Sequence, residues 1–436
     1  MIARDSTTAV EAVFRAKYGE LCASLLRAFG YHRFEVIEEA VQSAFERALE
    51  RWPHSGVPDN PAGWLYAVAR NTCLEAFRHA AVADRASAAL EATTAAVAIP
   101  DDELAQAIPG GLDDFAAMIL LCCNPDLSEK SQLCLMLKAG CGLSVREIGR
   151  LLGMADEAVK KTITRARQRV SSEAGTFGAL DNERIAARFP VVLETVYALF
   201  TEGYAASSGD LPLRRDVAVQ AVHLADVLLG SSFMPDAARG DLHAVIALML
   251  LQLARFEARV DPHGVPIRLQ EQDRRRWNSA MVRAGLDALA AATVSDRLSA
   301  YHLEARIAAE HSTSPSFGAT NWTRILDLYD QLLAFKDTTA VRLNRLVALR
   351  HAQGPMPALE QLDTSAFDAP WPAATAFLRH TVRADILEAL GRVDEARQSW
   401  RAALAAAPTA ADRAFVSRRA SGEQADVPVT GTGASS

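Results

Sequence analysis

The chain has 436 residues, of which 50% are hydrophobic and 23% are charged, and its formal net charge is −7. This composition is typical of globular domains and excludes an extensively disordered chain, and the length predicts about two to four domains. The longest apolar runs span about eight residues, whereas a membrane-spanning helix needs roughly 20, so we expect no membrane contact. The first residues carry acids and lack the apolar stretch of a signal peptide, which favours a cytoplasmic protein.

Six cysteines are present, and no two of them have the Cys-x-x-Cys spacing of a metal or redox site. The adjacent pair Cys122–Cys123 cannot easily hold one metal ion in tetrahedral geometry. We therefore expect the cysteines to be reduced, buried, small apolar side chains, and we expect no metal and no other cofactor. The six are Cys22, Cys73, Cys122, Cys123, Cys134 and Cys141.

Helical patterning dominates the chain and strand-like alternation is absent, so the sequence predicts an all-α fold. Apolar residues recur at spacings of three and four from Val36 to Leu49, which predicts one buried face of a helix. The dipeptide Trp52-Pro53 is expected to end that helix, because proline cannot donate a backbone hydrogen bond.

A loop and a second helix follow. Residues 54–60 are polar and contain a glycine and a proline, which is typical of a loop. Asn60 can cap the next helix, and Pro61 suits its first turn. We expect this helix to run from Ala62 to about Arg78.

Charge is unevenly distributed along the chain. Residues 81–127 hold one base and eight acids, whereas residues 128–170 hold nine bases and four acids. A basic segment beside an acidic one predicts a confined binding site for a polyanion. Composition and periodicity divide the chain into helical blocks at 10–80 and 113–172, an acidic linker at 81–112, a helical array at 182–420 and a disordered tail at 421–436.

The array at 182–420 contains a pattern typical of a tetratricopeptide (TPR) unit near its end. Ala396, Trp400, Ala403 and Pro408 have the spacing of small residues between two helices, an aromatic filling the next gap, and a proline after the second helix. The simpler alternative is any packed pair of helices. Because the array has no catalytic triad, phosphate loop or zinc spacing, we expect it to bind a protein or peptide, and we expect no enzyme activity.

The most informative segment is Leu143–Val170. Ser144 and Glu147 have the spacing of a capping box at the start of a first helix, and Gly153 suits the tight turn before a second helix. In that second helix apolar residues recur at spacings of four and three, whereas Lys160–Arg169 contains five bases and no acid. A helix with one apolar edge and a polar, basic opposite face suits reading of the DNA major groove; a solvated basic helix is the alternative.

Leu143–Val170 resembles region four of the extracytoplasmic-function (ECF) group of sigma-70 superfamily RNA polymerase sigma factors, because its L-S-x-x-E-I and V-K-x-x-x-x-R-A-R elements occur in the same order and spacing. Glu38–Phe45 is similar to region two of that family, and Pro61–Thr72 is similar to its helix that meets the −10 element. Leu269–Trp277 resembles part of a TPR-like extension found in one ECF subgroup. Asn124 stands where that subgroup has a histidine after two cysteines.

The resemblance implies core RNA polymerase, through its β′ clamp and β flap, and promoter DNA as partners. The implied polymerase-binding residues are Glu38, Glu39, Gln42, Phe45, Glu46 and Arg47. The implied −10 contacts are Asn60, Trp64, Arg70, Asn71 and Arg78. The −35 element would be read by Lys161, Thr164 and Arg165, with Lys160, Arg167, Gln168 and Arg169 as further DNA contacts. For the aromatic residues Phe45 and Trp64, a place in the hydrophobic core is the favoured alternative to a binding role.

The function implied is that of a bacterial, cytoplasmic ECF sigma factor that recognises −35 and −10 promoter elements and helps to initiate transcription. Its C-terminal array would regulate this activity or bind a partner. The acidic linker would run toward the RNA exit path of polymerase, or screen the basic helix in the free chain. The alternative is a one-component helix-turn-helix transcription regulator with a TPR-like sensor, although such a regulator needs neither Glu38–Phe45 nor Pro61–Thr72.

Overall fold

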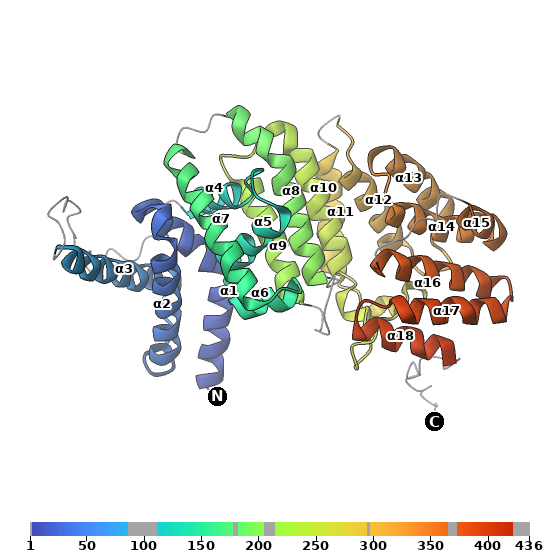
Figure 1. Ribbon diagram of the computed structural model, residues 1–436, viewed down its shortest axis with the longest axis horizontal. Helices are drawn as coiled ribbons and strands as arrows, with labels where there is room; N and C mark the ends of the chain where they lie inside the picture. The colour runs from blue at the N-terminus through green and yellow to red at the C-terminus, as the bar shows by residue number, and fades with distance from the viewer. Residues whose placement is uncertain are drawn as a thin grey trace, which may run out of the picture. The chain divides into compact units, whose positions relative to one another are not determined.

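The computed structural model describes residues 2–85, 111–177, 182–204, 214–293, 297–364 and 373–421. Within these ranges the chain is all-α apart from one isolated bridge between Val260 and Pro266, which confirms the predicted fold class. The chain divides into two compact units, drawn in Figure 1. Unit 1 comprises Met1–Ala205 and Arg214–His243, and unit 2 comprises Ala206–Leu213 and Ala244–Ser436.

Unit 1 contains both blocks that the sequence predicts at the N-terminal end, together with the first helices of the predicted array. Its helices are α1 (Ile2–Phe29), α2 (Phe34–Ser55), α3 (Pro61–Arg85), α4 (Gly111–Cys122), α5 (Glu129–Leu135), α6 (Val145–Leu151), α7 (Asp156–Phe177), α8 (Asn182–Tyr204) and α9 (Arg215–Gly230). A π-helical turn at Met136–Gly140 follows α5. Helices α8 and α9 pack against α4 and α5, so the start of the array belongs to the same core as the N-terminal blocks.

The buried side of α1 lies at the centre of unit 1. Tyr18 and Leu21 are almost fully buried on this side. Gly19 lies so close to α4 that a Cβ atom built on it would stand 2.3 Å from the ring of Phe115 and 2.9 Å from the carbonyl oxygen of Gly140. Only glycine fits α1 at this point, because any larger side chain would occupy the place of the Phe115 ring.

Helix α2 forms where the sequence predicts it, but two details differ. The predicted end at Pro53 is wrong by two residues: the helix continues to Ser55, although proline cannot donate the backbone hydrogen bond of that turn, and the chain turns at Gly56 with φ of 79°. Leu49, expected on the apolar face, is 45% exposed. The apolar stripe is therefore narrower than the spacing predicts at its C-terminal end.

Helix α3 begins at Pro61, and the Oδ1 atom of Asn60 accepts a hydrogen bond from the backbone N–H of Gly63 at 3.0 Å, which confirms the predicted cap. The helix runs to Arg85, beyond its predicted end. Residues 81–85, placed in the acidic linker, are therefore helical, and 86–110 lie outside the described residues.

Helix α10 (Asp236–Leu253) begins in unit 1 and ends in unit 2. With the residues that follow, Asp236–Ala258 is long and apolar enough to span a membrane by length and composition, which the count of uninterrupted apolar runs missed. Two thirds of its most apolar window (67%) is buried within the protein. Such burial is typical of a core helix, whose apolar surface is covered by its own chain.

Unit 2 is a succession of antiparallel helices. They are α11 (Ser279–Ala292), α12 (Ala300–Thr313), α13 (Trp322–Phe335), α14 (Thr339–Gln353), α15 (Pro355–Leu362), α16 (Ala373–Ala389), α17 (Val393–Ala406) and α18 (Ala410–Ser421). Ala396, Trp400 and Ala403 are buried between α16 and its neighbours, and Trp400 Nε1 donates to Glu388 at 2.8 Å. Pro408 follows the end of α17. This packing fits the TPR spacing and equally fits the simpler alternative of a packed pair of helices.

We expect Gly19→Ala to destabilise unit 1. Alanine favours a helix over glycine by about 1 kcal/mol, but overpacking against Phe115 typically costs about 1–3 kcal/mol. The net loss should appear as a lower midpoint in thermal unfolding of the full chain. Gly318→Ala is the control, since a Cβ atom added at Gly318 would meet nothing within 4 Å; an equal or higher midpoint for Gly19→Ala would contradict the close approach of α1 and α4.

Candidate nucleic-acid interface

Helices α6 and α7 form the predicted helix-turn-helix. The capping box is complete: Ser144 Oγ accepts from the N–H of Glu147 at 3.2 Å, and the Glu147 carboxylate accepts from the N–H of Ser144 at 2.9 Å. Gly153 adopts φ of 62°, the left-handed conformation that the tight turn requires. Gly149 allows the backbone of the turn at Met154 to pack closely against α6, because a Cβ atom at residue 149 would lie 2.7 Å from the carbonyl oxygen of Met154.

Helix α7 has one buried face and one exposed face, as predicted. Val159, Ile163, Ala166 and Val170 are at most 4% exposed and join the core of unit 1. The predicted DNA-contacting side chains that are exposed are Lys160, Lys161, Thr164, Arg165, Gln168 and Arg169. The helix continues to Phe177, five residues beyond the predicted end of the block at residue 172.

Two of these basic side chains have acidic partners. Lys160 Nζ lies 2.9 Å from Glu157, three residues earlier on the same helix, and both side chains are exposed. Arg169 pairs with Asp126, which precedes α5. Exposed pairs of this kind are weak, so both side chains can exchange their partner for a phosphate. Lys161 and Arg165 are exposed as well and lie on the same helix.

Arg167 differs from the other bases of α7 because it points into unit 1. Its side chain is 17% exposed, and its guanidinium pairs with the carboxylate of Glu38 on α2 and lies 4.6 Å from the ring centroid of Phe34. Nearby, Ser171 Oγ donates to the carbonyl oxygen of Tyr31 at 3.1 Å. The structure thus joins a residue predicted to bind DNA with a residue predicted to bind polymerase.

The Glu38 carboxylate is buried, with 5% of the residue exposed. Besides Arg167, it faces Lys138 of the π-helical turn, whose Nζ lies 3.8 Å away. Burial raises the pKa of the Glu38 carboxyl, and the charges of Arg167 and Lys138 oppose this rise. Glu38 Oε1 and Arg167 Nε, both buried, have no hydrogen-bond partner among the described atoms. The Glu38–Arg167–Lys138 cluster is therefore a polar junction that is only partly satisfied.

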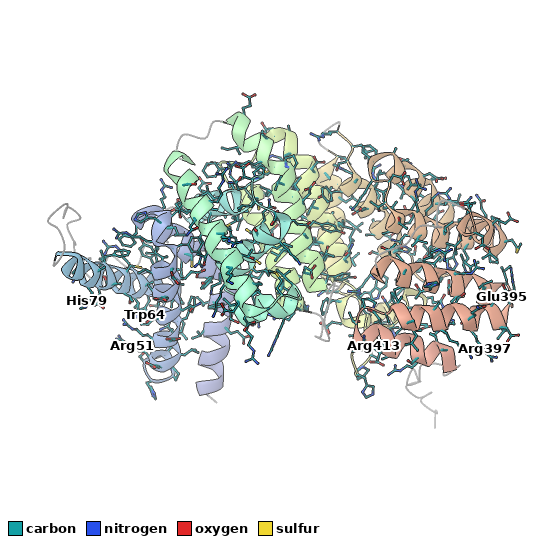
Figure 2. The ribbon with its side chains drawn as sticks, viewed as in Figure 1. Arg51, Trp64, His79, Glu395, Arg397 and Arg413 are labelled. Carbon is teal, nitrogen blue, oxygen red and sulfur yellow. The ribbon has the colours of Figure 1, made fainter. Side chains whose placement is uncertain are left out.

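The predicted −10 residues lie on and just before α3. Trp64 is half-buried, and its ring meets that of the buried Trp52 edge to face, with centroids 5.5 Å apart. Arg70 is half-buried, whereas Asn71 and Arg78 are exposed. Figure 2 labels Trp64 near the start of α3 and His79 toward its other end. Trp64 therefore combines a packing contact with an accessible edge.

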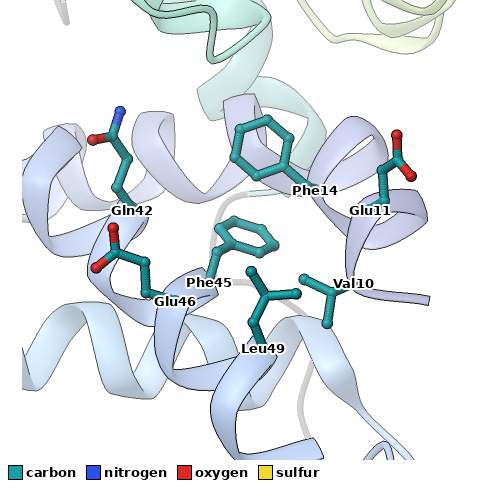
Figure 3. A pocket seen from close by; sticks show the side chains of 7 residues that line it. All are labelled: Val10, Glu11, Phe14, Gln42, Phe45, Glu46 and Leu49. Atoms are coloured by element: carbon teal, nitrogen blue, oxygen red, sulfur yellow. The ribbon is translucent and has the colours of Figure 1, made fainter. Parts of the chain in front are cut away.

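A groove of about 450 Å³ lies between α1 and α2. Figure 3 shows the side chains that line it: Val10, Glu11, Phe14, Gln42, Phe45, Glu46 and Leu49. The predicted polymerase-binding residues Gln42, Phe45 and Glu46 meet here, and the Phe14 and Phe45 rings pack edge to face at 4.9 Å. Phe45 is 4% exposed, so it forms the floor of the groove and belongs to the core, as the favoured alternative predicts.

The remaining polymerase-binding predictions fall outside this groove. Glu38 faces α7, whereas Glu39 and Arg47 are exposed on α2. Sequence reasoning missed the contribution of α1, where Val10 and Phe14 line the groove. The available signal was the recurrence of Val10, Phe14, Tyr18 and Leu21 at spacings of four and three, which predicts one buried face of a helix.

The cysteines occupy apolar surroundings. All six are free thiols, and all are buried except Cys141, which is half-buried. Burial raises the pKa of the Cys122 and Cys123 thiols, so neither is activated as a nucleophile. Asn124, which follows them, forms a turn by accepting from the N–H of Asp126 at 2.9 Å. In the described part of the chain, no group of three or more His, Cys, Asp or Glu residues is placed to hold a metal ion.

We expect Arg167→Gln to destabilise the contact between α7 and α2 by about 3–5 kcal/mol near pH 8, because it leaves the buried Glu38 carboxylate with a single, more distant cation. The pKa of this carboxyl, already raised in the folded state, should rise further. The folded variant then binds a proton more readily than the unfolded chain, so its stability increases as the pH falls through that pKa.

Hydrogen exchange of α7 peptides near pH 8 and near pH 5 measures this opening free energy. Arg165→Gln is the matched control, since Arg165 is exposed on the same helix, and its effect should stay within about 0.5 kcal/mol. A loss in Arg167→Gln that is the same at both pH values would argue against a buried carboxylate as the cause.

Three family models and one related protein match parts of this chain. A model of sigma-70 region 2 matches residues 15–82, and a model of sigma-70 region 4 matches residues 117–170. A family of unknown function, DUF6596, matches residues 188–293. An uncharacterized protein of Rhizobium meliloti (strain 1021) is 32% identical over 395 residues, which cover 90% of each chain. No solved structure matches the chain.

The two sigma-70 matches cover the α2 side of the groove, helix α3 and the helix-turn-helix, in the order in which the sequence predicts them, whereas the groove residues Val10, Glu11 and Phe14 precede the first match. The match at residues 188–293 begins within α8 and ends after α11, so α12 to α18 lie beyond it. The chain therefore belongs to the sigma-70 family of sigma factors and carries a helical C-terminal extension.

Proposed function

We propose that this protein is an ECF-type sigma factor that joins core RNA polymerase in the bacterial cytoplasm, recognises −35 and −10 promoter elements and helps to initiate transcription. The observation that carries the proposal is the exposed basic face of α7, presented by a helix-turn-helix in the same compact unit as α2 and α3. Such a helix suits the major groove, where side chains read base edges while flanking cations hold phosphates.

The exposed side chains of α7 divide into two groups by position. Lys161, Thr164 and Arg165 project from the middle of the exposed face and are proposed to read the −35 bases. Lys160 and Arg169, now paired with carboxylates, are proposed to bind phosphates. Arg167 can take that role only after it leaves Glu38. Phosphate contacts of this kind make binding fall steeply with added salt.

The groove between α1 and α2 is the proposed polymerase contact in region two. It combines an apolar floor with the acids Glu11 and Glu46 and the amide of Gln42 at its rim. Leu49 adds an exposed apolar side chain at one end. An apolar centre with a polar rim is typical of protein interfaces, and the rim acids give a basic partner its orientation.

Promoter opening requires single-stranded DNA to be held better than duplex, and it needs no covalent chemistry. Trp64 can stack on a displaced base, and Asn71 and Arg78 are exposed on the same helix to meet the strand. Stacking on an aromatic side chain is worth about 1–3 kcal/mol per base. These contacts support a role for α3 at the −10 element and require no cofactor.

For the C-terminal extension we propose a regulatory or partner-binding role, with the helical hairpins of unit 2 as a surface for a protein or peptide. Its first helices also complete the core of unit 1. Thr195 on α8 donates to the buried side chain of Gln132 at 2.8 Å, and Ser232 donates to Asp113. Truncation after the helix-turn-helix would remove helices that cover the core of unit 1 and expose its apolar side chains to water. Activity is therefore best tested in the full chain.

The decisive experiment is run-off transcription with purified core RNA polymerase and the full chain, on the protein's own upstream region and a randomised promoter pool. We expect specific starts that require the chain. If the chain binds specific DNA but never supports a start, it is a one-component regulator, and the assignments in region two fail.

Arg165→Gln should weaken binding of the holoenzyme to its promoter by about 1–3 kcal/mol and relax base preference at one −35 position, because a bidentate contact is lost. Competition binding with all single-base variants of the −35 element measures both effects. Arg401→Gln, an exposed arginine in unit 2, is the control for lost charge alone. Equal weakening on every sequence would reassign Arg165 to a phosphate.

Leu49→Glu should reduce the affinity for core polymerase at least about tenfold, since it places a charge against the apolar part of the groove while leaving the fold intact. Val219→Glu makes the same change at an exposed site on α9 and should bind normally. Affinity is measured by fluorescence anisotropy with core polymerase. Unchanged binding of Leu49→Glu would exclude this groove as the contact.

A further inference from the structure

Unit 2 contains a cluster of cations and aromatic rings that the proposed function does not use. It consists of Arg255, which follows α10, Arg274 and Trp277, which precede α11, and His311 in the last turn of α12. The guanidinium carbons of Arg255 and Arg274 lie 5.5 Å and 4.5 Å from the centroid of the Trp277 ring. We call these four residues the Arg255–His311 cluster.

Arg274 is held in place by the end of a helix. Its Nη1 atom donates to the carbonyl oxygens of His311 and Ser314, at 2.6 Å and 2.7 Å. These carbonyls lie at the C-terminal end of α12, where a cation is favourable. One end of the guanidinium is thereby fixed, and its Nη2 atom is left to face the rest of the cluster.

The cluster lacks the carboxylate that neighbouring arginines have. Arg275 pairs with Asp273, and Arg268 and Arg350 share Asp385. Within the described residues, Arg255 and Arg274 form no ion pair; both contact the Trp277 ring, and Arg274 also donates to two backbone carbonyls. Two like charges therefore stand beside one indole without neutralisation.

Burial and the positive charges of this cluster lower the pKa values of Arg274 and His311. Burial and the charge of Arg255 lower the pKa of Arg274. Burial, followed by the charges of Arg255 and Arg274, lowers the pKa of His311 to about 4, so its imidazole is neutral at pH 7. Both guanidiniums are only half-buried, and holding two like charges side by side without a counter-charge still costs free energy.

Three unsatisfied atoms of the cluster can only donate hydrogen bonds. Arg255 Nε, Arg274 Nη2 and Trp277 Nε1 are buried and have no hydrogen-bond partner in the described structure. All three are obligate donors. His311 Nδ1 and the hydroxyl of Ser312 are unpartnered as well and can donate or accept. A group that offers several acceptor oxygens and negative charge would satisfy both the donors and the charges.

We propose that the Arg255–His311 cluster binds the oxyanion of a small ligand, either a phosphate or a carboxylate group. Trp277 aligns the two guanidiniums, and Arg255 supplies the charge that no protein group neutralises. A small ligand fits better than a DNA backbone, because the unsatisfied donor atoms are buried, whereas the exposed cations of α7 suit an extended polyanion.

The test uses the full chain, with inorganic phosphate and succinate as separate probes at constant ionic strength set with chloride. Calorimetric titration should show saturable binding of one of them, which identifies the oxyanion class. Arg255→Gln should raise the dissociation constant at least about tenfold, since a charge-assisted contact is lost. Arg276→Gln removes an exposed arginine of the same segment and should leave the dissociation constant unchanged.

A second variant protects the test against misfolding. Trp277→Phe keeps an aromatic face for both guanidiniums but removes the Nε1 donor, so it should weaken binding while the thermal midpoint without ligand stays close to that of the natural chain. The proposal is overturned if neither probe binds saturably, or if Arg255→Gln and Arg276→Gln weaken binding equally. It is also overturned if a random-sequence DNA duplex alone binds in an Arg255-dependent manner.

Discussion

The arrangement of unit 1 depends on one buried carboxylate. Glu38 lies on α2 with 5% of its surface exposed, and a charge at such a place needs cations close by. Arg167 from α7 and Lys138 from the π-helical turn supply them. Because these cations come from the region-four part of the chain, neutralising Glu38 fixes the orientation of the helix-turn-helix relative to α1 and α2.

The same contact sets a relation between the two proposed partners. Arg167 cannot meet a DNA phosphate, and Glu38 cannot meet a polymerase cation, while they pair with each other. A partner that takes Arg167 leaves the Glu38 carboxylate with Lys138 alone, and a partner that takes Glu38 leaves Arg167 without a carboxylate, so engaging either one weakens the closed contact. The unpartnered Glu38 Oε1 and Arg167 Nε atoms make the closed contact less stable than a fully satisfied one.

Local patterns predicted α2, α3 and the two helices α6 and α7 of the helix-turn-helix, whereas contacts between distant residues could not be predicted. The Ser144 cap, the Gly153 turn and the apolar edge of α7 follow from spacing, because each is decided within one or two helical turns. The pair Glu38–Arg167 joins residues 129 positions apart, and nothing local marks either as the partner of the other. Leu49 was predicted to be buried but is 45% exposed. Helical spacing gives the side of the helix on which a residue lies, but it does not show whether another part of the chain covers that side.

Arginine is abundant in both units, and burial decides what each arginine can do. On α7, Arg165 stands in water, where a guanidinium is stable alone and free to meet a polyanion. Arg255 and Arg274 are half-buried against Trp277, where a charge without a partner is costly and a specific anion gains most. Sequence alone treats these residues alike, since a basic segment looks the same whether its charges face solvent or one another. The distinction emerges from packing, and it separates a DNA-binding surface from a candidate ligand site in the same chain.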